Sequence, residues 1–307
     1  MLVYKRKRND LKVFEFRPEG RHKTHCWDTY MDLAQVRLVV SDMDGTLLNE
    51  KGKVSDRFFK LYEELLALDV HFIAASGRQY FSIIDKLNPI KDGITVIAEN
   101  GGISQRKDEV LLTMSLNKDT VKILIEKIRE LEDAHMVLCG KKQAYVESDH
   151  TEFLSIFPEY YIKYAQVDDL LDVVADDEFF KIAVYSFKGS ENSTYPAFKG
   201  EEKKIKVKVS PENRLDLSGF DTNKGNALKH VQELLGISKE ETLVLGDYNN
   251  DLEMMEQAHF SYAMQNAHPN VMKAARYSTK SNNQEGVEEV LEELITAKKK
   301  ALTSTGG

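Results

Sequence analysis

The sequence predicts an α/β protein in which a doubly wound parallel sheet carries an inserted α+β cap domain. In the first and last thirds of the chain, short apolar runs alternate with amphipathic helical patterns, which is typical of parallel strands connected by helices. In the middle third, strand patterns follow one another closely and are joined by turns, which indicates antiparallel pairing. We therefore expect two domains, the second of which interrupts the first.

The 307 residues divide into five predicted segments. Two stretches form the core, and the cap is inserted between them. A basic N-terminal extension, expected to be peripheral or disordered, and a polar C-terminal tail flank this unit. The predicted bounds are 1–33 for the extension, 34–104 and 216–297 for the core, 105–215 for the cap and 298–307 for the tail.

The first half of the core begins with the apolar run 38–40, which predicts a buried strand. Ser55 is the predicted N-cap of a helix whose apolar residues recur between 58 and 68. Further strands are predicted at 70–75 and 94–98, with a helical pattern between them. Polar residues follow each strand at its carboxyl end, where open parallel sheets bind ligands.

The cap pattern mixes helices and hairpins. Helices are predicted over 117–131, 153–157 and 167–173, and strands over 136–138, 144–146, 179–187 and 205–217. The lysine-rich stretch 199–208 favours a solvated edge strand. In the second half of the core, the sequence predicts a helix that starts after Asn223 and ends at Gly236, followed by a buried strand at 242–245.

Composition excludes several classes of protein. The net charge of −8 argues against a binder of nucleic acid or of anionic membranes. No apolar run approaches the roughly 18 residues of a membrane span. Cys26 and Cys139 have no metal-type spacing, so we expect a reducing, cytoplasmic setting. We also expect a monomer or weak homo-oligomer.

Two carboxylates follow the first buried strand. Asp42 and Asp44 are one residue apart, so their side chains point the same way from the strand end. Two such charges about 4 Å apart repel by roughly 4 kcal/mol at an effective dielectric constant near 20. A hard cation such as Mg²⁺ between the two carboxylates would turn this net repulsion into a net attraction. One aspartate could then be a nucleophile and the other a proton carrier, although a simple Asx turn would also explain the pair.

A second acidic strand end lies at 246–251, with the sequence GDYNND. An EF-hand loop would need glycine at its sixth position, where Leu252 stands, so that alternative fails. The remaining hypothesis is a shared site in which Asp42, Asp247 and Asp251 supply oxygen ligands to Mg²⁺ and a substrate phosphate completes the shell.

Two further residues suit a phosphate. Ser76 is predicted at a strand end just before a helix N-terminus, where a hydroxyl and free N–H groups can bind an anion, although it could simply cap the helix. Lys224 is predicted at a helix start. It could be an ordinary exposed lysine, or it could offset the repulsion between Asp42 and an incoming phosphate.

Four motifs in order resemble those of the haloacid dehalogenase superfamily. They are DMDGT at 42–46, Ser76 in ASGR, Lys224 in NKGNAL and GDYNND at 246–251. The insert is similar to the large α/β cap of the Cof-type (subfamily IIB) sugar-phosphate phosphatases, and Glu99–Gly102 resembles their Asn-Gly segment before the cap. The resemblance covers about 34–297 and implies a Rossmann-like core.

The resemblance also implies roles for the residues. Asp42 would attack phosphorus and Asp44 would act as general acid and base. Mg²⁺ would lie on Asp42, the backbone carbonyl of Asp44 and Asp247, with Asp251 nearby. The residues implied for the phosphate or substrate are Ser76, Gly77, Lys224, Thr46 and Asn250.

The resulting hypothesis is a Mg²⁺-dependent phosphatase of small phosphorylated metabolites, in particular sugar phosphates, acting through an aspartyl phosphate. A phosphotransferase or phosphosugar mutase on the same scaffold is one alternative, and a non-catalytic phosphometabolite-binding protein is another. The cap residues Lys141, Lys142 and Lys181 could face the site, and Lys181 could equally face solvent.

Overall fold

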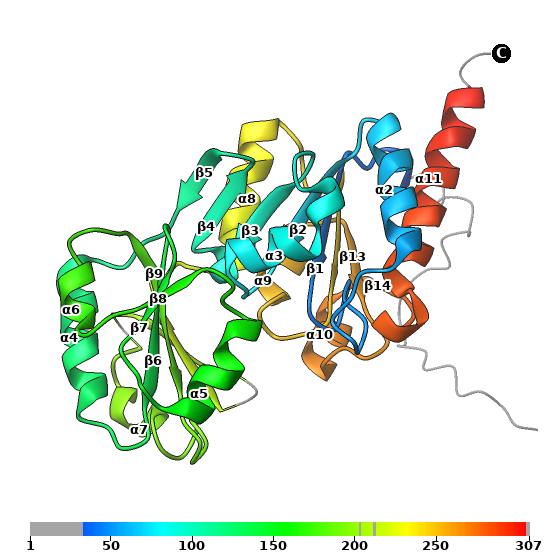
Figure 1. The fold of residues 1–307 in the computed structure, drawn as a ribbon. Helices are drawn as coiled ribbons and strands as arrows, with labels where there is room; N and C mark the ends of the chain where they lie inside the picture. Colours follow the sequence, from blue (N-terminus) through cyan, green and yellow to red (C-terminus); the bar gives the residue numbers. More distant parts are fainter. Residues whose placement is uncertain (1–32, 203, 211–212, 305–307) are drawn as a thin grey trace, which may run out of the picture.

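The computed structural model describes residues 33–202, 204–210 and 213–304 (Figure 1). All but the last residue of the predicted N-terminal extension, 1–33, lie outside this part of the chain. The described residues form a core and a smaller cap, drawn mainly in green in Figure 1, as the sequence predicted. No helix among them combines the length and apolar character needed to cross a membrane.

The core contains an eight-stranded sheet in the order β14-β13-β12-β1-β2-β3-β4-β5. Neighbours from β14 to β3 are parallel, whereas β3, β4 and β5 pair antiparallel. The strands are β1 (Leu38–Asp42), β2 (His71–Ala75), β3 (Thr95–Ala98), β4 (Ile103–Arg106), β5 (Glu109–Thr113), β12 (Thr242–Gly246), β13 (Phe260–Ala263) and β14 (Tyr277–Ser278).

Helices connect these strands. They are α2 (Asp56–Ala67), α3 (Tyr80–Lys86), α8 (Lys224–Leu235), α9 (Leu252–Met255), α10 (Pro269–Ala274) and α11 (Gly286–Ser304), with the short 3₁₀ helices η1 (Asn88–Ile90), η2 (Glu99–Gly101) and η4 (Asn282–Gln284). Ser55 caps α2 by accepting a hydrogen bond from the Phe58 N–H, as predicted. Gly236 ends α8 in the left-handed conformation, with φ of 60°.

Strand β1 lies at the point where the strand order reverses. The chain leaves β1 toward β2 and β3, and it later returns to the other side of β1 through β12. All residues of β1 are buried, which explains its continuous apolar pattern. Ligands of open α/β sheets bind at such a reversal, outside the carboxyl ends of the strands. Asp42 ends β1, and Asp247 directly follows β12.

The cap has a six-stranded sheet in the order β10-β11-β9-β6-β7-β8, in which the last pair is parallel and the others antiparallel. The lysine-rich β10 is an edge strand, as predicted, but Lys206 and Lys208 are half-buried, so the expected solvated character was wrong. The strands are β6 (His135–Gly140), β7 (Ala144–Val146), β8 (Tyr164–Gln166), β9 (Phe179–Tyr185), β10 (Lys206–Ser210) and β11 (Arg214–Ser218). The helices are α4 (Lys118–Arg129), α5 (Thr151–Ile156), η3 (Phe157–Glu159), α6 (Leu170–Val173) and α7 (Tyr195–Phe198).

Alternating side chains of β9 give the cap sheet two different faces. Ile182 and Val184 pack in the cluster that contains α4 residues, whereas Ala183 packs with Phe153 and Phe157 beneath α5 and η3. The cap therefore has one hydrophobic core behind its sheet and a second, more aromatic cluster in front of it.

Three predicted boundaries were wrong. The cap was expected to begin at 105, but this position lies within β4, and β4 and β5 extend the core sheet by antiparallel pairing. The cap was expected to end at 215, yet β11 continues in the cap sheet to Ser218. The predicted tail from 298 is helical up to Ser304, because buried Ala297 and a hydrogen bond from Lys298 Nζ to the Ala34 carbonyl hold α11 against the core.

Candidate active site

Lys224 joins acids from distant parts of the chain. Asn223 caps α8, so Lys224 begins this helix beside the carboxyl ends of β1 and β12. Its Nζ lies 2.5 Å from Asp42 Oδ1 and 2.7 Å from Asp251 Oδ1, and its side chain is fully buried. The alternative of an exposed lysine is therefore wrong. Burial lowers the pKa of Lys224, but Asp251 and Asp42 raise it by more, so the side chain is charged.

Asp251 supports the strand end after β12. Its Oδ2 accepts hydrogen bonds from the backbone N–H groups of Asp247, at 2.9 Å, and of Tyr248, at 3.0 Å. Its Oδ1 accepts from Lys224. Both oxygens of this fully buried carboxylate thus shape the turn that presents Asp247.

Three carboxylates converge here. Asp42, Asp247 and Asp251 each offer an oxygen, and these atoms lie within 4.8 Å of one another. Burial raises the pKa of Asp42 well above its ordinary range, against the opposing effect of Lys224. Burial and the charge of Asp251 raise the pKa of Asp247 to about 6. The single positive charge of Lys224 does not balance the three carboxylates. Carboxylate oxygens are hard ligands, and they fit a divalent cation such as Mg²⁺.

Gly45 and Thr46 position Asp247. Gly45 has φ of +77°, and a Cβ there would lie 2.3 Å from Asp247 Oδ2. Only glycine therefore allows the turn after β1 to approach the second acid. The buried Thr46 hydroxyl donates a hydrogen bond of 3.0 Å to Asp247 Oδ1. Thr46, predicted to contact the phosphate, contacts Asp247 instead.

A pocket of about 330 Å³ opens above these acids. It is lined by residues from both domains: Asp42, Asp44, Gly45, Ser76, Gly77, Arg78, Asn100, Tyr160, Lys208, Arg214, Asp247, Tyr248 and Asn250. Of the predicted site residues, Thr46, Lys224 and Asp251 lie outside this wall and support it from behind. The structure thus gathers the predicted residues in and around one pocket.

Ser76 and Gly77 form part of the wall at the end of β2. The Ser76 hydroxyl accepts a hydrogen bond from the Arg78 N–H at 3.1 Å. The residue at the N-cap of α3 is Gln79, so Ser76 does not cap that helix. Asn100 connects this part of the wall to the turn after β12, since its backbone N–H donates to the Ser76 carbonyl at 3.0 Å and its Oδ1 accepts from Asn250 Nδ2 at 3.1 Å.

Arg78 was not among the predicted site residues, although it belongs to the ASGR motif. Its guanidinium binds both carboxylate oxygens of Asp44, and its Nη1 donates to the cap carbonyl of Glu159 at 2.9 Å. The Arg78 side chain is almost fully buried, whereas that of Asp44 is 51% exposed to the pocket and solvent. The Asp44 carboxylate therefore faces the pocket, and Arg78 fixes its orientation.

The cap contributes Tyr160, Lys208 and Arg214 to the wall, which the sequence patterns did not indicate. Lys208 lies on edge strand β10, and burial together with Lys206 lowers its pKa. The alternation of β10 provides a weak signal, since Lys206 and Lys208 share a face. Lys141 and Lys142 form contacts with Glu178 and Asp177 of the cap instead.

Lys181 lies at the contact between the two domains. It is buried, and its Nζ is 2.8 Å from Glu99 Oε2 and 2.8 Å from the Gly77 carbonyl, both in the core. Asp216 Oδ2 is a more distant partner at 3.9 Å. Lys181 therefore faces neither solvent nor the pocket but ties the cap to the loop that carries Ser76 and Gly77.

This geometry matches a chemical task. A carboxylate held by a buried lysine, a second carboxylate open to the pocket and a cluster of acids that could hold a cation can together support phosphoryl transfer through a covalent intermediate. Cap residues form part of the pocket wall, where a cap can limit access of water.

Comparison with known proteins gives a consistent result. Residues 39–291 match the family of haloacid dehalogenase-like hydrolases. The chain is 33% identical over 264 residues to the 5-amino-6-(5-phospho-D-ribitylamino)uracil phosphatase YbjI of Escherichia coli, covering 85% of this chain and 96% of that protein. It is 30% identical to the putative phosphatase YxeH of Bacillus subtilis, with coverage of 85% and 99%.

Solved structures agree with these relatives. The crystal structure of TM0651 from Thermotoga maritima superimposes with a TM-score of 0.76 at 29% identity, covering 84% of this chain and 97% of that one. Members of this family are typically metal-dependent, and the acidic cluster of Asp42, Asp247 and Asp251 could hold a metal ion. The chain therefore belongs to the haloacid dehalogenase-like hydrolases, as a Cof-type phosphatase that hydrolyses phosphoric monoesters of small metabolites.

Proposed function

We propose that this protein is a Mg²⁺-dependent phosphatase of sugar phosphates that acts through an aspartyl phosphate on Asp42. The observation that carries the proposal is the placement of Asp42: its carboxylate lies in the pocket wall, held by Lys224 and next to the acids of the cation site. Asp44, the second carboxylate of the wall, is the proton carrier.

The covalent step makes one bond and breaks another. The Asp42 carboxylate attacks phosphorus, so an acyl phosphate bond forms while the bond from phosphorus to the substrate alcohol breaks. Asp44 gives its proton to the leaving oxygen. In the second half, water attacks the acyl phosphate, Asp44 takes the proton of that water, and Asp42 and inorganic phosphate are released.

The other residues hold charge in place. Lys224 keeps a positive charge beside Asp42 and lowers the repulsion that the incoming phosphate would meet. Ser76, Gly77 and Asn250 offer polar groups at the wall for the phosphate or the substrate. When bound, Mg²⁺ would supply charge neutralisation between the acids and the phosphate.

The contacts described above support one set of ligands for Mg²⁺. Asp42 and Asp247 would hold the ion directly. Asp251 would act from behind, because its two oxygens are engaged by Lys224 and by backbone N–H groups. The Asp44 carboxylate is bound to Arg78, which leaves its backbone carbonyl as the group available to the ion.

A second substrate candidate is the phosphate ester that names the relative of Escherichia coli, a phosphorylated ribitylaminouracil. The 33% identity over 96% of that protein favours it. It shares with the sugar phosphates a phosphorylated polyol chain, and it adds a ring.

The test is phosphate release from a panel of both compound types, with Mg²⁺ and with excess EDTA. We expect activity that requires the ion. Asp42→Asn should lose at least about 10⁴-fold in kcat, whereas Asp85→Asn, a change at an exposed position of α3, should have no effect. Full activity of Asp42→Asn or activity in EDTA would refute the proposal. Adding an acceptor alcohol shows whether the product is inorganic phosphate or a new phosphoester, as a transferase would make.

A further inference from the structure

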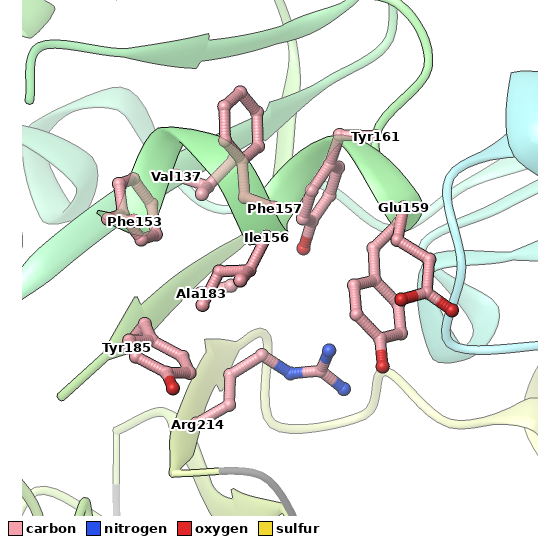
Figure 2. Close-up of a pocket in the computed structure, with 10 residues that line it drawn as sticks. Val137, Phe153, Ile156, Phe157, Glu159, Tyr161, Ala183, Tyr185 and Arg214 are labelled. Carbon is pink, nitrogen blue, oxygen red and sulfur yellow. The ribbon is translucent and has the colours of Figure 1, made fainter. Parts of the chain in front are cut away.

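A second cavity, of about 270 Å³, lies inside the cap beside the catalytic pocket. Figure 2 shows its walls: Phe153, Phe157 and Tyr161 come from the α5–η3 segment and the residues after it, and Ala183 and Tyr185 come from strand β9. These side chains belong to the aromatic cluster in front of the cap sheet. Nothing in the proposed chemistry uses this space.

Two side chains form the boundary between the cavity and the catalytic pocket. Tyr160 and Arg214 line both spaces. The Arg214 guanidinium carbon lies 5.4 Å from the centroid of the Tyr160 ring, and that of Arg78 lies 4.9 Å from the same centroid. The two spaces are therefore adjacent, with a cation–π contact between them, and a ligand that extends from the acids into the cap has to pass this contact.

The size and chemistry of the cavity select its occupant. An apolar cavity of about 150 Å³ accepts benzene, so 270 Å³ leaves room for a substituted ring. Phe157 and Tyr185 provide ring faces against which a planar group can stack. The lining offers tyrosine hydroxyls from Tyr160, Tyr161 and Tyr185, but most of its surface is apolar, so the several hydroxyl groups of a plain sugar would lose more hydrogen bonds to water than they regain. The charged groups of Glu159 and Arg214 lie at the side of the cavity nearer the core, as Figure 2 shows.

We propose that the cap cavity is a subsite for a planar ring on the leaving group, so that phosphomonoesters whose alcohol carries such a ring react more efficiently than the plain sugar phosphates that the catalytic pocket also accepts. The inference rests on the proposed phosphatase function and adds a binding site to it. The phosphate and its polyol or alkyl chain occupy the catalytic pocket, and the ring passes Tyr160 and Arg214 into the cap.

The experiment compares matched substrates. Phenylalkyl phosphates with three, four or five methylene groups are assayed with Mg²⁺ against the alkyl phosphates of the same chain length, so that the ring is the variable at each length. Burial of one aromatic ring should raise kcat/KM about 10- to 100-fold at one or more of these lengths, mainly through KM.

Two isoleucines of the cap supply the variants. Ile156 lines the cavity and is 38% exposed, and Ile162 is 49% exposed and lines neither the cavity nor the catalytic pocket. Ile156→Trp places a larger side chain at the cavity, and we expect it to reduce the preference for the ring at least about fivefold. Ile162→Trp is the matched control and should keep the preference of the native protein. Both positions are partly exposed, so neither change overpacks a closed core.

The outcomes separate the two proposals. Absence of phosphate release from every ester would refute the phosphatase function itself. Release at equal efficiency with and without the ring, at all three lengths, would overturn the subsite while leaving the phosphatase function intact. An undiminished ring preference in Ile156→Trp would also overturn it, because the ring would then bind elsewhere.

Discussion

The guanidinium of Arg78 holds both carboxylate oxygens of Asp44, with 2.8 Å from Nε to Oδ2 and 2.7 Å from Nη2 to Oδ1. The same guanidinium donates to the Glu159 carbonyl of the cap at 2.9 Å. One side chain thus connects the proposed proton carrier to the domain that covers the pocket. A planar, two-pronged donor is needed for this contact, and lysine cannot reproduce it.

We expect Arg78→Lys to lower kcat about 10- to 100-fold, because Asp44 would lose its fixed orientation. The KM for a small phosphate ester should change much less. Steady-state kinetics, with kcat and KM determined separately, tests this. Arg57→Lys is the control, since Arg57 forms exposed ion pairs with Glu285 and Glu292 far from the pocket. An unchanged kcat in Arg78→Lys would show that Asp44 needs no such support.

Two glycines with positive φ allow a matched test of the cation site. Gly45→Ala should abolish most activity and weaken Mg²⁺ binding measured by calorimetry, because the new Cβ would lie 2.3 Å from Asp247 Oδ2. Gly52→Ala meets the same backbone strain at φ of +65°, but its nearest neighbour would be 3.6 Å away. It should cost about 1 kcal/mol of stability and leave Mg²⁺ binding intact. Equal Mg²⁺ affinity in the two variants would contradict the assignment of Asp247.

Lys181 should be essential for stability. Lys181→Met would leave Glu99 and Asp216 buried without their shared cation, and we expect a loss of about 3–5 kcal/mol in the free energy of unfolding. Lys188→Met removes a pair with Glu132 in which the side chains are 60% and 90% exposed, and it should cost less than about 0.5 kcal/mol.

Urea unfolding followed by circular dichroism measures both lysine variants. The double variant Lys181→Met with Glu99→Gln should recover part of the loss, because it removes the buried Glu99 charge that loses its cation, whereas Asp216 keeps Arg214 at 3.3 Å. A Lys181→Met protein as stable as the native one would mean that water reaches this cluster.

Glu288 gives a pH dependence with a definite sign. Its carboxylate is buried against α2 and accepts a hydrogen bond of 2.5 Å from Ser55 Oγ. Burial raises the pKa of Glu288 above its ordinary value of 4.5 despite this bond. Between that value and the raised one, the folded protein binds more protons than the unfolded chain, so its stability falls as pH rises.

Glu288→Gln should remove that pH-dependent part. The difference in unfolding free energy between Glu288→Gln and the native protein should therefore grow in favour of the variant as pH rises above 4.5 and then become constant. Glu292→Gln, at a side chain that is 50% exposed, is the control. A difference for Glu288→Gln that does not change with pH would contradict the prediction.

The central acids of the site could be predicted because they directly follow the ends of buried strands. Asp42 and Asp247 each terminate an apolar run, and parallel topology alone brings such ends together. Arg78 was missed because its partner, Asp44, lies 34 residues away and on another strand end, so no local pattern marks the pair.

The cap side of the pocket could not be predicted. Tyr160 and Arg214 reach the pocket only because of how the inserted domain packs against the core, and the spacing of residues along the chain does not indicate that packing. The predicted start of the cap at 105 was wrong for a related reason. Antiparallel β4 and β5 have the same hairpin pattern as the cap strands, and only their pairing with β3 assigns them to the core sheet.

The ion pair between Asp42 and Lys224 joins residues 182 positions apart. During synthesis, the first of these leaves the ribosome long before the second, and the entire cap is translated in the interval. A nascent chain that stops short of α8 would therefore expose an acid with no counterion at the end of its central strand. Assembly of the pocket is in this way coupled to completion of the polypeptide, and a truncated product has no route to the active arrangement.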